Sequence, residues 1–233
     1  MTDEKNNASG REPAACCRLL REPQLERSLV RIVDDNAQTC DSLRFFLESL
    51  GFHAETWTDP VRFLSEWRED ARPGCILLDI RMPELSGLEL LEKLAAQKCP
   101  HPIVFLTGHG DVEMAVRALK RGASDFLLKP PEEEKIVNAV ERAVLLGIER
   151  SSEARIGKDA LERWSRLTDR ERDVIGLVAK GLMNKQIADL LEIADKTVQQ
   201  HRGSACRKLS IRNAVEAAEF LRLLQRAGDD SWS

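Results

Sequence analysis

The chain has 233 residues and a mass of 26.3 kDa, which suits one large domain or two modest ones. Hydrophobic residues make up 42% and charged residues 32%, so the chain can bury a core and is not broadly disordered. No stretch approaches the ~18 apolar residues of a membrane span, and no secretory signal precedes the first patterned segment. Six cysteines without a C-x-x-C pair indicate neither a disulfide scaffold nor zinc, so we expect a cytoplasmic protein without a membrane partner.

Charge is distributed unevenly along the chain. Residues 164–226 carry a net charge of +4, with 12 Lys and Arg against 8 Asp and Glu, whereas the remaining residues carry a net charge of −8. A basic module on an acidic protein indicates contact with nucleic acid, although taken alone this signal is weak.

Short apolar runs alternate with segments of helical spacing from residue 29 onward. Residues 1–27, which include Cys16 and Cys17, indicate a flexible leader, with a short helix around residues 14–20 as the alternative. The apolar runs are residues 29–33, 52–57, 75–78, 103–106 and 125–128, and the helical segments are residues 42–50, 61–67, 88–96, 112–119 and 136–146. Because parallel strands need a connection of helical length, this order predicts a flavodoxin-like (βα)5 fold, a doubly wound parallel sheet, over residues 28–147.

Beyond the α/β pattern, the sequence shows helical spacing alone. Residues 148–163 are polar and charged, which predicts a linker or a frayed extension of the preceding helix. Thr168 and Glu171 have the spacing of a capping box ahead of a helix over residues 172–179, and three more helices are expected over residues 184–191, 197–209 and 215–224. The sequence therefore predicts a four-helix domain over residues 164–227 and a tail over residues 228–233.

Polar residues follow the ends of four predicted strands: Asp34 and Asp35, Asp79, Thr107, and Lys129. The carboxyl ends of parallel strands meet at one edge of a sheet, so these side chains should share one site. Three close carboxylates repel one another unless a cation neutralises them, and all-oxygen ligands favour Mg²⁺. Each residue alone is more often a solvated loop residue or a helix cap, and the joint placement of all five is what indicates a site.

The segment over residues 28–147 resembles the receiver domain of two-component response regulators, most closely the FixJ-like subgroup. The resemblance rests on residues 32–35 (IVDD), 78–87 (LDIRMPELSG), 106–110 (LTGHG) and 125–130 (DFLLKP). It implies that Asp79 is the aspartate that accepts a phosphoryl group. It further implies a set of ligands, namely Asp34, Asp35, Asp79 and the main-chain oxygen of Arg81 for Mg²⁺, and Thr107 and Lys129 for the phosphoryl oxygens.

The resemblance also implies a way of transmitting the signal. Phe126 lies where the family has a switch aromatic, which turns inward as Thr107 moves toward the phosphoryl group. This movement would remodel a face formed by residues 112–120, 125–128 and 132–143, and an ordinary core phenylalanine is the alternative. The Lys129–Pro130 bond is a candidate cis peptide, and Pro131 departs from the aromatic residue more usual there.

Residues 161–226 resemble the LuxR-type helix-turn-helix domain, through residues 167–174 (LTDRERDV), 179–188 (AKGLMNKQIA), 196–202 (KTVQQHR), 207–209 (RKL) and 213–217 (NAVEA). On the predicted helix over residues 197–209, Val198, Ala205 and Leu209 share one face and should pack inward. The opposite face should enter the major groove of double-stranded DNA, with base contacts expected from Gln199, Gln200, Gly203 and Ser204, and a contact to phosphate or guanine from Arg207. Phosphate contacts are expected from Lys185, Lys196, Thr197, Arg202 and Lys208.

Gly203 departs from helical propensity, since a glycine inside a helix costs about 1 kcal/mol relative to alanine. We hypothesise that its missing side chain permits close approach to a base edge or a thymine methyl group.

Three functions fit these features. In the first, a sensor histidine kinase phosphorylates Asp79, and the resulting homodimer binds promoter half-sites about 10 bp apart, with RNA polymerase as a further partner. In the second, the chain is a phosphatase, but Arg81 stands where many such hydrolases place a general acid, so we expect no enzyme activity beyond slow self-dephosphorylation. In the third, the receiver is only a dimerisation module of a phosphorylation-independent transcription factor, and the complete set of five site residues argues against this.

Overall fold

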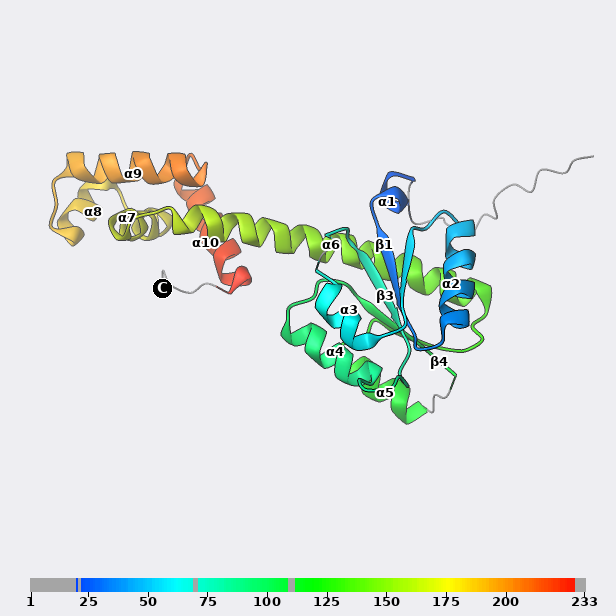
Figure 1. Cartoon of the computed structure of the whole chain (residues 1–233). Coiled ribbons are helices and arrows are strands. Elements are labelled where there is room, and N and C mark those ends of the chain that lie inside the picture. Colours follow the sequence, from blue (N-terminus) through cyan, green and yellow to red (C-terminus); the bar gives the residue numbers. More distant parts are fainter. Residues whose placement is uncertain (1–19, 21, 69–70, 109–111, 229–233) are drawn as a thin grey trace, which may run out of the picture. The chain divides into compact units, whose positions relative to one another are not determined.

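The structure is a computed structural model that describes residues 20, 22–68, 71–108 and 112–228. The chain divides into two compact units, residues 1–151 and residues 152–233 (Figure 1). The long helix α6 (Glu133–Ser165) contributes residues to both units. Cys16, Cys17 and the alternative helix before residue 20 lie outside the described residues, as do residues 229–233 of the tail.

The first unit contains a parallel sheet of five strands: β1 (Leu29–Val33), β2 (Ala54–Trp57), β3 (Gly74–Leu78), β4 (Ile103–Thr107) and β5 (Asp125–Leu128). The strand order is β2-β1-β3-β4-β5, and every neighbouring pair is parallel. The accompanying helices are α2 (Ala37–Ser49), α3 (Pro60–Glu66), α4 (Gly87–Ala96), α5 (Val112–Lys120) and the first part of α6. The predicted fold class is confirmed for this unit.

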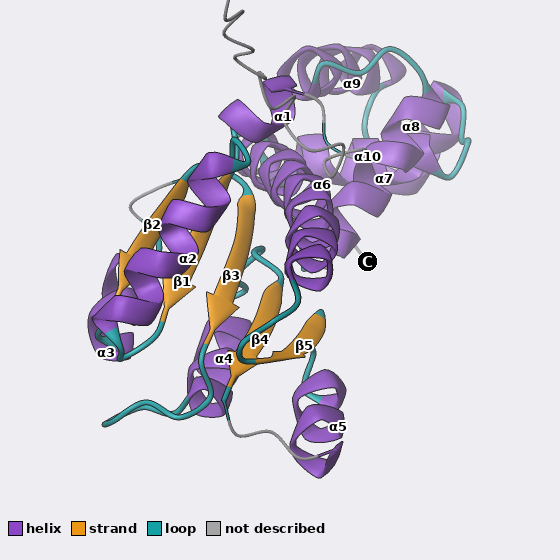
Figure 2. Ribbon diagram, turned by 90° about the vertical axis from the view of Figure 1, so that its right-hand side faces the viewer, coloured by secondary structure: helices purple, strands orange, loops and turns teal. Residues whose placement is uncertain are grey.

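Helices cover both faces of the sheet (Figure 2). On one face, Val30 and Ile32 of β1 join a core to which α2 and α6 contribute, whereas Val33 faces the other side with residues of α3 and α4. The same alternation holds along β3 and β4. Strands buried on both faces need apolar residues at consecutive positions. This explains why residues 75–78 of β3 and 103–106 of β4 do not alternate between apolar and polar side chains.

Several helix boundaries differ from the predicted ones. Helix α2 begins at Ala37 rather than at residue 42, because the side chain of Asn36 caps it by accepting a hydrogen bond from the amide of Thr39 at 3.1 Å. Helix α6 continues through residues 148–163, so of the two alternatives given for that segment the structure has the extension of the preceding helix. A short helix, α1 (Glu22–Glu26), lies within the segment predicted as a flexible leader, and Leu25 packs against the core that contains Val30.

The second unit combines the end of α6 with four helices: α7 (Asp169–Ala179), α8 (Asn184–Leu191), α9 (Asp195–Leu209) and α10 (Ala214–Ala227). The predicted capping box between Thr168 and Glu171 is present at the start of α7. The core of the second unit includes Val198, Ala205 and Leu209, the three residues of α9 that were expected to face inward. In the part of the chain that the structure describes, no helix is both long and apolar enough to cross a membrane.

Candidate functional site

Three carboxylates come together at the carboxyl edge of the sheet. Asp34 and Asp35 follow β1 and Asp79 follows β3, and a carboxylate oxygen of each lies within 4.8 Å of the others. Asp34 and Asp79 are 2% and 7% exposed, whereas Asp35 is open to solvent. The structure thus assembles the acidic cluster that the strand ends predict, with two of its carboxylates shielded from water.

Lys129, directly after β5, offsets part of this negative charge. Its Nζ lies 3.2 Å from Asp79 Oδ1 and also forms an ion pair with Asp34. Burial acts to lower the pKa of Lys129, but the hydrogen bond to Asp34 and the charges of both carboxylates outweigh burial and raise that pKa above its ordinary value. The ammonium group is therefore held, charged, between two aspartates.

Backbone amides orient the two buried carboxylates. The amide of Asn36 donates to Asp34 Oδ1 at 3.0 Å, and the amide of Arg81 donates to Asp79 Oδ2 at 3.1 Å. The amide of Asp79 itself donates to the carbonyl of Val33 at 2.9 Å, which ties the end of β3 to β1. Asp79 consequently presents one oxygen to Lys129 and the other to the loop that follows it.

Thr107 lies at the same edge of the sheet as Lys129. It is the last residue of β4, is 1% exposed, and its carbonyl accepts a hydrogen bond from the amide of Lys129 at 2.9 Å. Phe126 pairs with Phe105 in the β4–β5 register and is half-buried against the core of that face, so its switch role stays a prediction. The Lys129–Pro130 peptide is cis, as expected from the sequence.

A glycine that was not assigned a role supports the position of Asp79. A Cβ atom on Gly87, the first residue of α4, would lie 2.1 Å from the carbonyl oxygen of Asp79 and 3.0 Å from the ring of Phe105. The amide of Gly87 donates to the carbonyl of Ile80 at 2.9 Å, which closes the loop after Asp79. In the sequence Gly87 is the last residue of the motif over residues 78–87, and nothing in that motif reveals a close backbone contact.

The residues present fit a hard divalent cation. The acidic cluster offers three carboxylates whose oxygens lie close enough to share one ion, and Mg²⁺ prefers oxygen ligands of this kind. Asp79 belongs both to this group and to the pair with Lys129, so a cation bound here would share the Asp79 carboxylate with the lysine.

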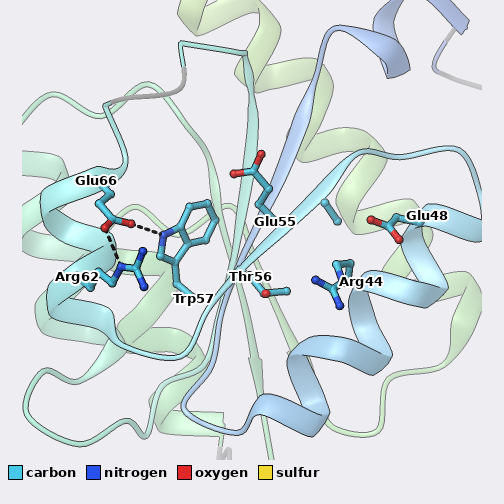
Figure 3. A pocket seen from close by; sticks show the side chains of 8 residues that line it. Arg44, Glu48, Glu55, Thr56, Trp57, Arg62 and Glu66 are labelled. Carbon is cyan, nitrogen blue, oxygen red and sulfur yellow. Dashed lines mark hydrogen bonds and ion pairs between the residues drawn. The ribbon is translucent and has the colours of Figure 1, made fainter.

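A polar groove elsewhere in the first unit is separate from the acidic cluster. It runs along the edge strand β2 between α2 and α3 and is lined by Arg44, Glu48, Ala54, Glu55, Thr56, Trp57, Arg62 and Glu66 (Figure 3). Glu66 accepts hydrogen bonds from Arg62 at 2.7 Å and from the indole of Trp57 at 3.1 Å. Charged side chains along an edge strand discourage pairing with other chains, and this groove contains none of the five predicted site residues.

The second unit presents a polar stripe on α9. Lys196, Gln200, Gly203 and Arg207 recur every three or four residues and so share one side of the helix, opposite the buried residues Val198, Ala205 and Leu209. Lys196, Gln200 and Arg207 are exposed, and Lys185 at the start of α8 is exposed as well. We call Lys196, Gln200, Gly203 and Arg207 the outward stripe.

Gly203 leaves room for a larger side chain within the outward stripe. A Cβ atom there would meet Arg207 Nη1 at 3.7 Å, an ordinary contact distance. The fold of the second unit therefore accommodates an alanine at this position, in contrast to Gly87 of the first unit.

Several other predicted DNA contacts have partners within the unit. Arg202 donates to the side chain of Asn184 at 2.8 Å, and Gln199 donates to Asp195 at 2.7 Å. Thr197 is half-buried. Contacts of this kind hold α9 against the start of α8 and order the beginning of α9 itself.

Lys208 and Ser204 differ most from their predicted role. The ammonium of Lys208 donates hydrogen bonds to both carboxylate oxygens of Glu171, at 2.9 and 2.7 Å, and Ser204 helps to lower the pKa of that carboxyl. Burial acts to raise the pKa of Glu171, but the bonds from Lys208, Ser204 and the amide of Thr168 outweigh it and lower that pKa to about 2. These two residues thus serve a contact between helices, which the sequence could not indicate because it depends on the burial of Glu171.

Comparison with known proteins agrees with both units. Residues 30–141 match the response regulator receiver domain, and residues 165–221 match the luxR family of bacterial regulatory proteins. The transcriptional regulatory protein FixJ of Bradyrhizobium diazoefficiens is 39% identical over 204 residues, which cover 85% of this chain and 95% of FixJ. The response regulator TodT of Pseudomonas putida is 36% identical over 206 residues, which cover 87% of this chain and 90% of TodT.

Among solved structures, the response regulator StyR is 41% identical with a TM-score of 0.72, and the match covers 86% of this chain and 99% of StyR. A receiver domain followed by a LuxR-type DNA-binding domain defines the class of DNA-binding response regulators in two-component systems. The chain belongs to this family of response regulators.

Proposed function

We propose that Asp79 accepts a phosphoryl group from the phosphohistidine of a sensor histidine kinase. An oxygen of Asp79 attacks the phosphorus, the P–N bond to the imidazole breaks, and an acyl phosphate forms on the aspartate. The observation that carries this proposal is the contact of Asp79 with Lys129 at 3.2 Å inside the acidic cluster. The ammonium of Lys129 on one side and the amide of Arg81 on the other hold the carboxylate of Asp79 in one orientation. Phosphoryl transfer depends on such positioning of the reacting group.

The neighbouring residues divide the remaining tasks. Lys129 pairs with one phosphoryl oxygen and the hydroxyl of Thr107 donates to another, which stabilises charge as it develops. The proposed Mg²⁺ ligands are Asp34, Asp35, Asp79 and the main-chain oxygen of Arg81. When bound, Mg²⁺ supplies positive charge beside the transferring group. Because Arg81 is not an acid, we propose no turnover beyond slow self-dephosphorylation.

Dimerisation is the proposed consequence of phosphorylation. Val116 and Leu119 of α5 and Leu128 of β5 are 43%, 47% and 53% exposed, so the face predicted to be remodelled carries apolar side chains open to solvent. Exposed apolar groups of this kind support association with a second copy. Movement of Thr107 toward the phosphoryl group and of Phe126 into the vacated space would change this face.

DNA recognition is assigned to α9. We propose that the outward stripe enters the major groove, with Gln200 and Arg207 reading base edges and Lys185 and Lys196 contacting phosphates. A two-fold dimer would place two such helices on half-sites about 10 bp apart, where RNA polymerase is the further partner.

The test uses the full chain treated with beryllofluoride and Mg²⁺, with sedimentation and DNA binding as readouts. We expect a shift to dimer and tighter binding for the wild type and no shift for Asp79→Asn. Asp41→Asn, an exposed aspartate of α2, is the matched control and should behave as the wild type. Equal behaviour of wild type and Asp79→Asn would contradict phosphoryl control and favour the phosphorylation-independent alternative.

A further inference from the structure

Helices α7 and α9 are joined through the carboxylate of Glu171. Lys208, near the end of α9, contacts both oxygens of that carboxylate at 2.9 and 2.7 Å, and Ser204, one turn earlier, helps to lower the pKa of Glu171. The amide of Thr168 donates to the same carboxylate at 2.8 Å. One side chain thus accepts hydrogen bonds from the end of α9 and from the start of α7.

Capping of α7 does not account for this arrangement. The capping box of α4 uses the same chemistry, because Glu89 accepts bonds from the amide and hydroxyl of Ser86 at 2.9 and 2.6 Å, yet Glu89 is exposed. The side chain of Glu171, by contrast, is 5% exposed. Burying a carboxylate is unfavourable unless it is paired, so the burial of Glu171 is linked to its partners on α9.

The same contacts define how α9 is rotated. Ser204 directly follows Gly203, and Lys208 directly follows Arg207, both residues of the outward stripe. Consecutive residues of an α-helix are about 100° apart, so Ser204 and Lys208 lie about 100° around the helix from the stripe. Val198 and Leu209 hold α9 against the core, but apolar contacts have little directional preference. Hydrogen bonds weaken steeply when their geometry changes, so the carboxylate restricts both rotation and sliding of α9.

We propose that Glu171 is a positioning residue for DNA recognition, which fixes the rotation and axial position of α9 through its two contacts with Lys208. The outward stripe is thereby presented to the base edges in a single orientation. This inference rests on the proposed entry of α9 into the major groove. It also means that the charge of Lys208 is matched by Glu171 and not by a DNA phosphate.

The experiment measures two affinities for the full chain activated with beryllofluoride. One probe is the duplex that the wild type enriches from a random-sequence pool, and the other is a shuffled duplex of equal length. We expect Glu171→Gln to lower the ratio of the two affinities at least about tenfold, the scale of one lost base contact. Affinity for the shuffled duplex should hold or rise, because the substitution releases the positive charge of Lys208.

Salt dependence separates positioning from phosphate binding. Lys208→Met should lower the ratio of affinities and leave the slope of log affinity against log salt unchanged. Lys196→Met, at a proposed phosphate contact, should reduce that slope by about 1. Glu89→Gln, which alters the exposed capping box, is the matched control and should change neither readout.

A double variant keeps the test decisive if Glu171→Gln alone does not fold. Glu171→Gln combined with Lys208→Met leaves no unpaired buried charge, so it should fold and still show the lowered ratio. A folded variant with the wild-type ratio overturns the inference, as does an equal loss on both duplexes in step with lost helicity. A wild type that enriches no sequence overturns the proposed DNA recognition and the inference with it.

Discussion

A Cβ atom on Gly147 would lie 1.9 Å from the carbonyl oxygen of Gly74, so α6 crosses the start of β3 at a distance that only glycine permits. Gly74 is in turn pressed against β1, because its own Cβ would meet the carbonyl oxygen of Leu29 at 1.9 Å, and its φ of +153° suits glycine. Three backbone segments therefore stack without intervening side chains. The position of α6 on the first unit depends on this stack.

Gly147→Ala should destabilise the first unit, because the added methyl group must push α6 away from β3. We expect the free energy of unfolding to fall by about 1–3 kcal/mol, as for other overpacked sites, measured by urea unfolding with circular dichroism. Gly176→Ala in α7 is the control, since nothing lies within 4 Å of its Cβ. That substitution should stabilise the chain by about 0.5–1 kcal/mol, and an equally stable Gly147→Ala protein would argue against the close crossing.

Gly87→Ala should impair phosphorylation of Asp79. Its methyl group would displace the main chain of Asp79, whose carbonyl oxygen is 2.1 Å from the Cβ position. Misplacement of a reacting group by a fraction of an ångström is costly, so we expect the rate with acetyl phosphate to fall at least about tenfold. The mass of the intact protein reports the acyl phosphate, and Gly176→Ala should react at the wild-type rate. Unchanged kinetics in Gly87→Ala would mean that the loop after Asp79 yields without moving the carboxylate.

Met183→Ser should stabilise the second unit. Met183 occupies the cap position of α8 and is 70% exposed, and its thioether is a weak acceptor for the amides of the first turn. Gln186 already accepts the amide of Met183 at 2.9 Å, so a serine would complete a capping box. We expect a gain of about 1 kcal/mol in thermal unfolding relative to Met183→Ala, which removes the side chain without supplying an acceptor. Equal stability of the two variants would show that the cap is not limiting.

Acid should destabilise the second unit through Glu171. The folded-state pKa of Glu171 is lowered from 4.5 to about 2, so its contribution is present above pH 4.5 and is lost as pH falls toward 2. Because folding lowers this pKa, the ionised carboxylate stabilises the folded second unit at neutral pH. Unfolding free energies measured between pH 6 and pH 2 should fall more steeply for the wild type than for Glu171→Gln. Parallel curves would indicate that the carboxylate is not held by Lys208 in solution.

Much of the fold and of the acidic cluster follows from local patterns. Apolar runs located the strands. Because parallel strands end at one edge of the sheet, the residues that follow them, including Asp79 and Lys129, were predicted to share one site. Patterns failed where contacts are distant in sequence. Nothing local distinguishes Glu171 from Glu89, since both occupy the same place in a capping box, and only the packing of α9 onto α7 buries the former.

The start of one helix and the close backbone contacts of two glycines were also not predicted from the sequence. The first turn of α2 has few apolar residues, so spacing placed its start too late, whereas the Asn36 cap sets the actual start. Gly87 and Gly147 are indistinguishable from tolerated glycines until the neighbouring backbone is in place, because their contacts with Asp79 and Gly74 exist only in the folded chain.

The packing of the end of α6 determines at which residue an isolated DNA-binding fragment should begin. Trp164 is 2% exposed, its ring lies 6.5 Å from that of Phe220, and Ala160 one turn earlier is buried in the same core. A Cβ on Gly157 would lie 3.2 Å from that of Ala227, so α10 also rests on this part of α6. A truncated protein that starts at the predicted boundary, residue 164, would lose the packing of Ala160 and Gly157, whereas one that starts at residue 152 retains the whole helical hydrophobic core.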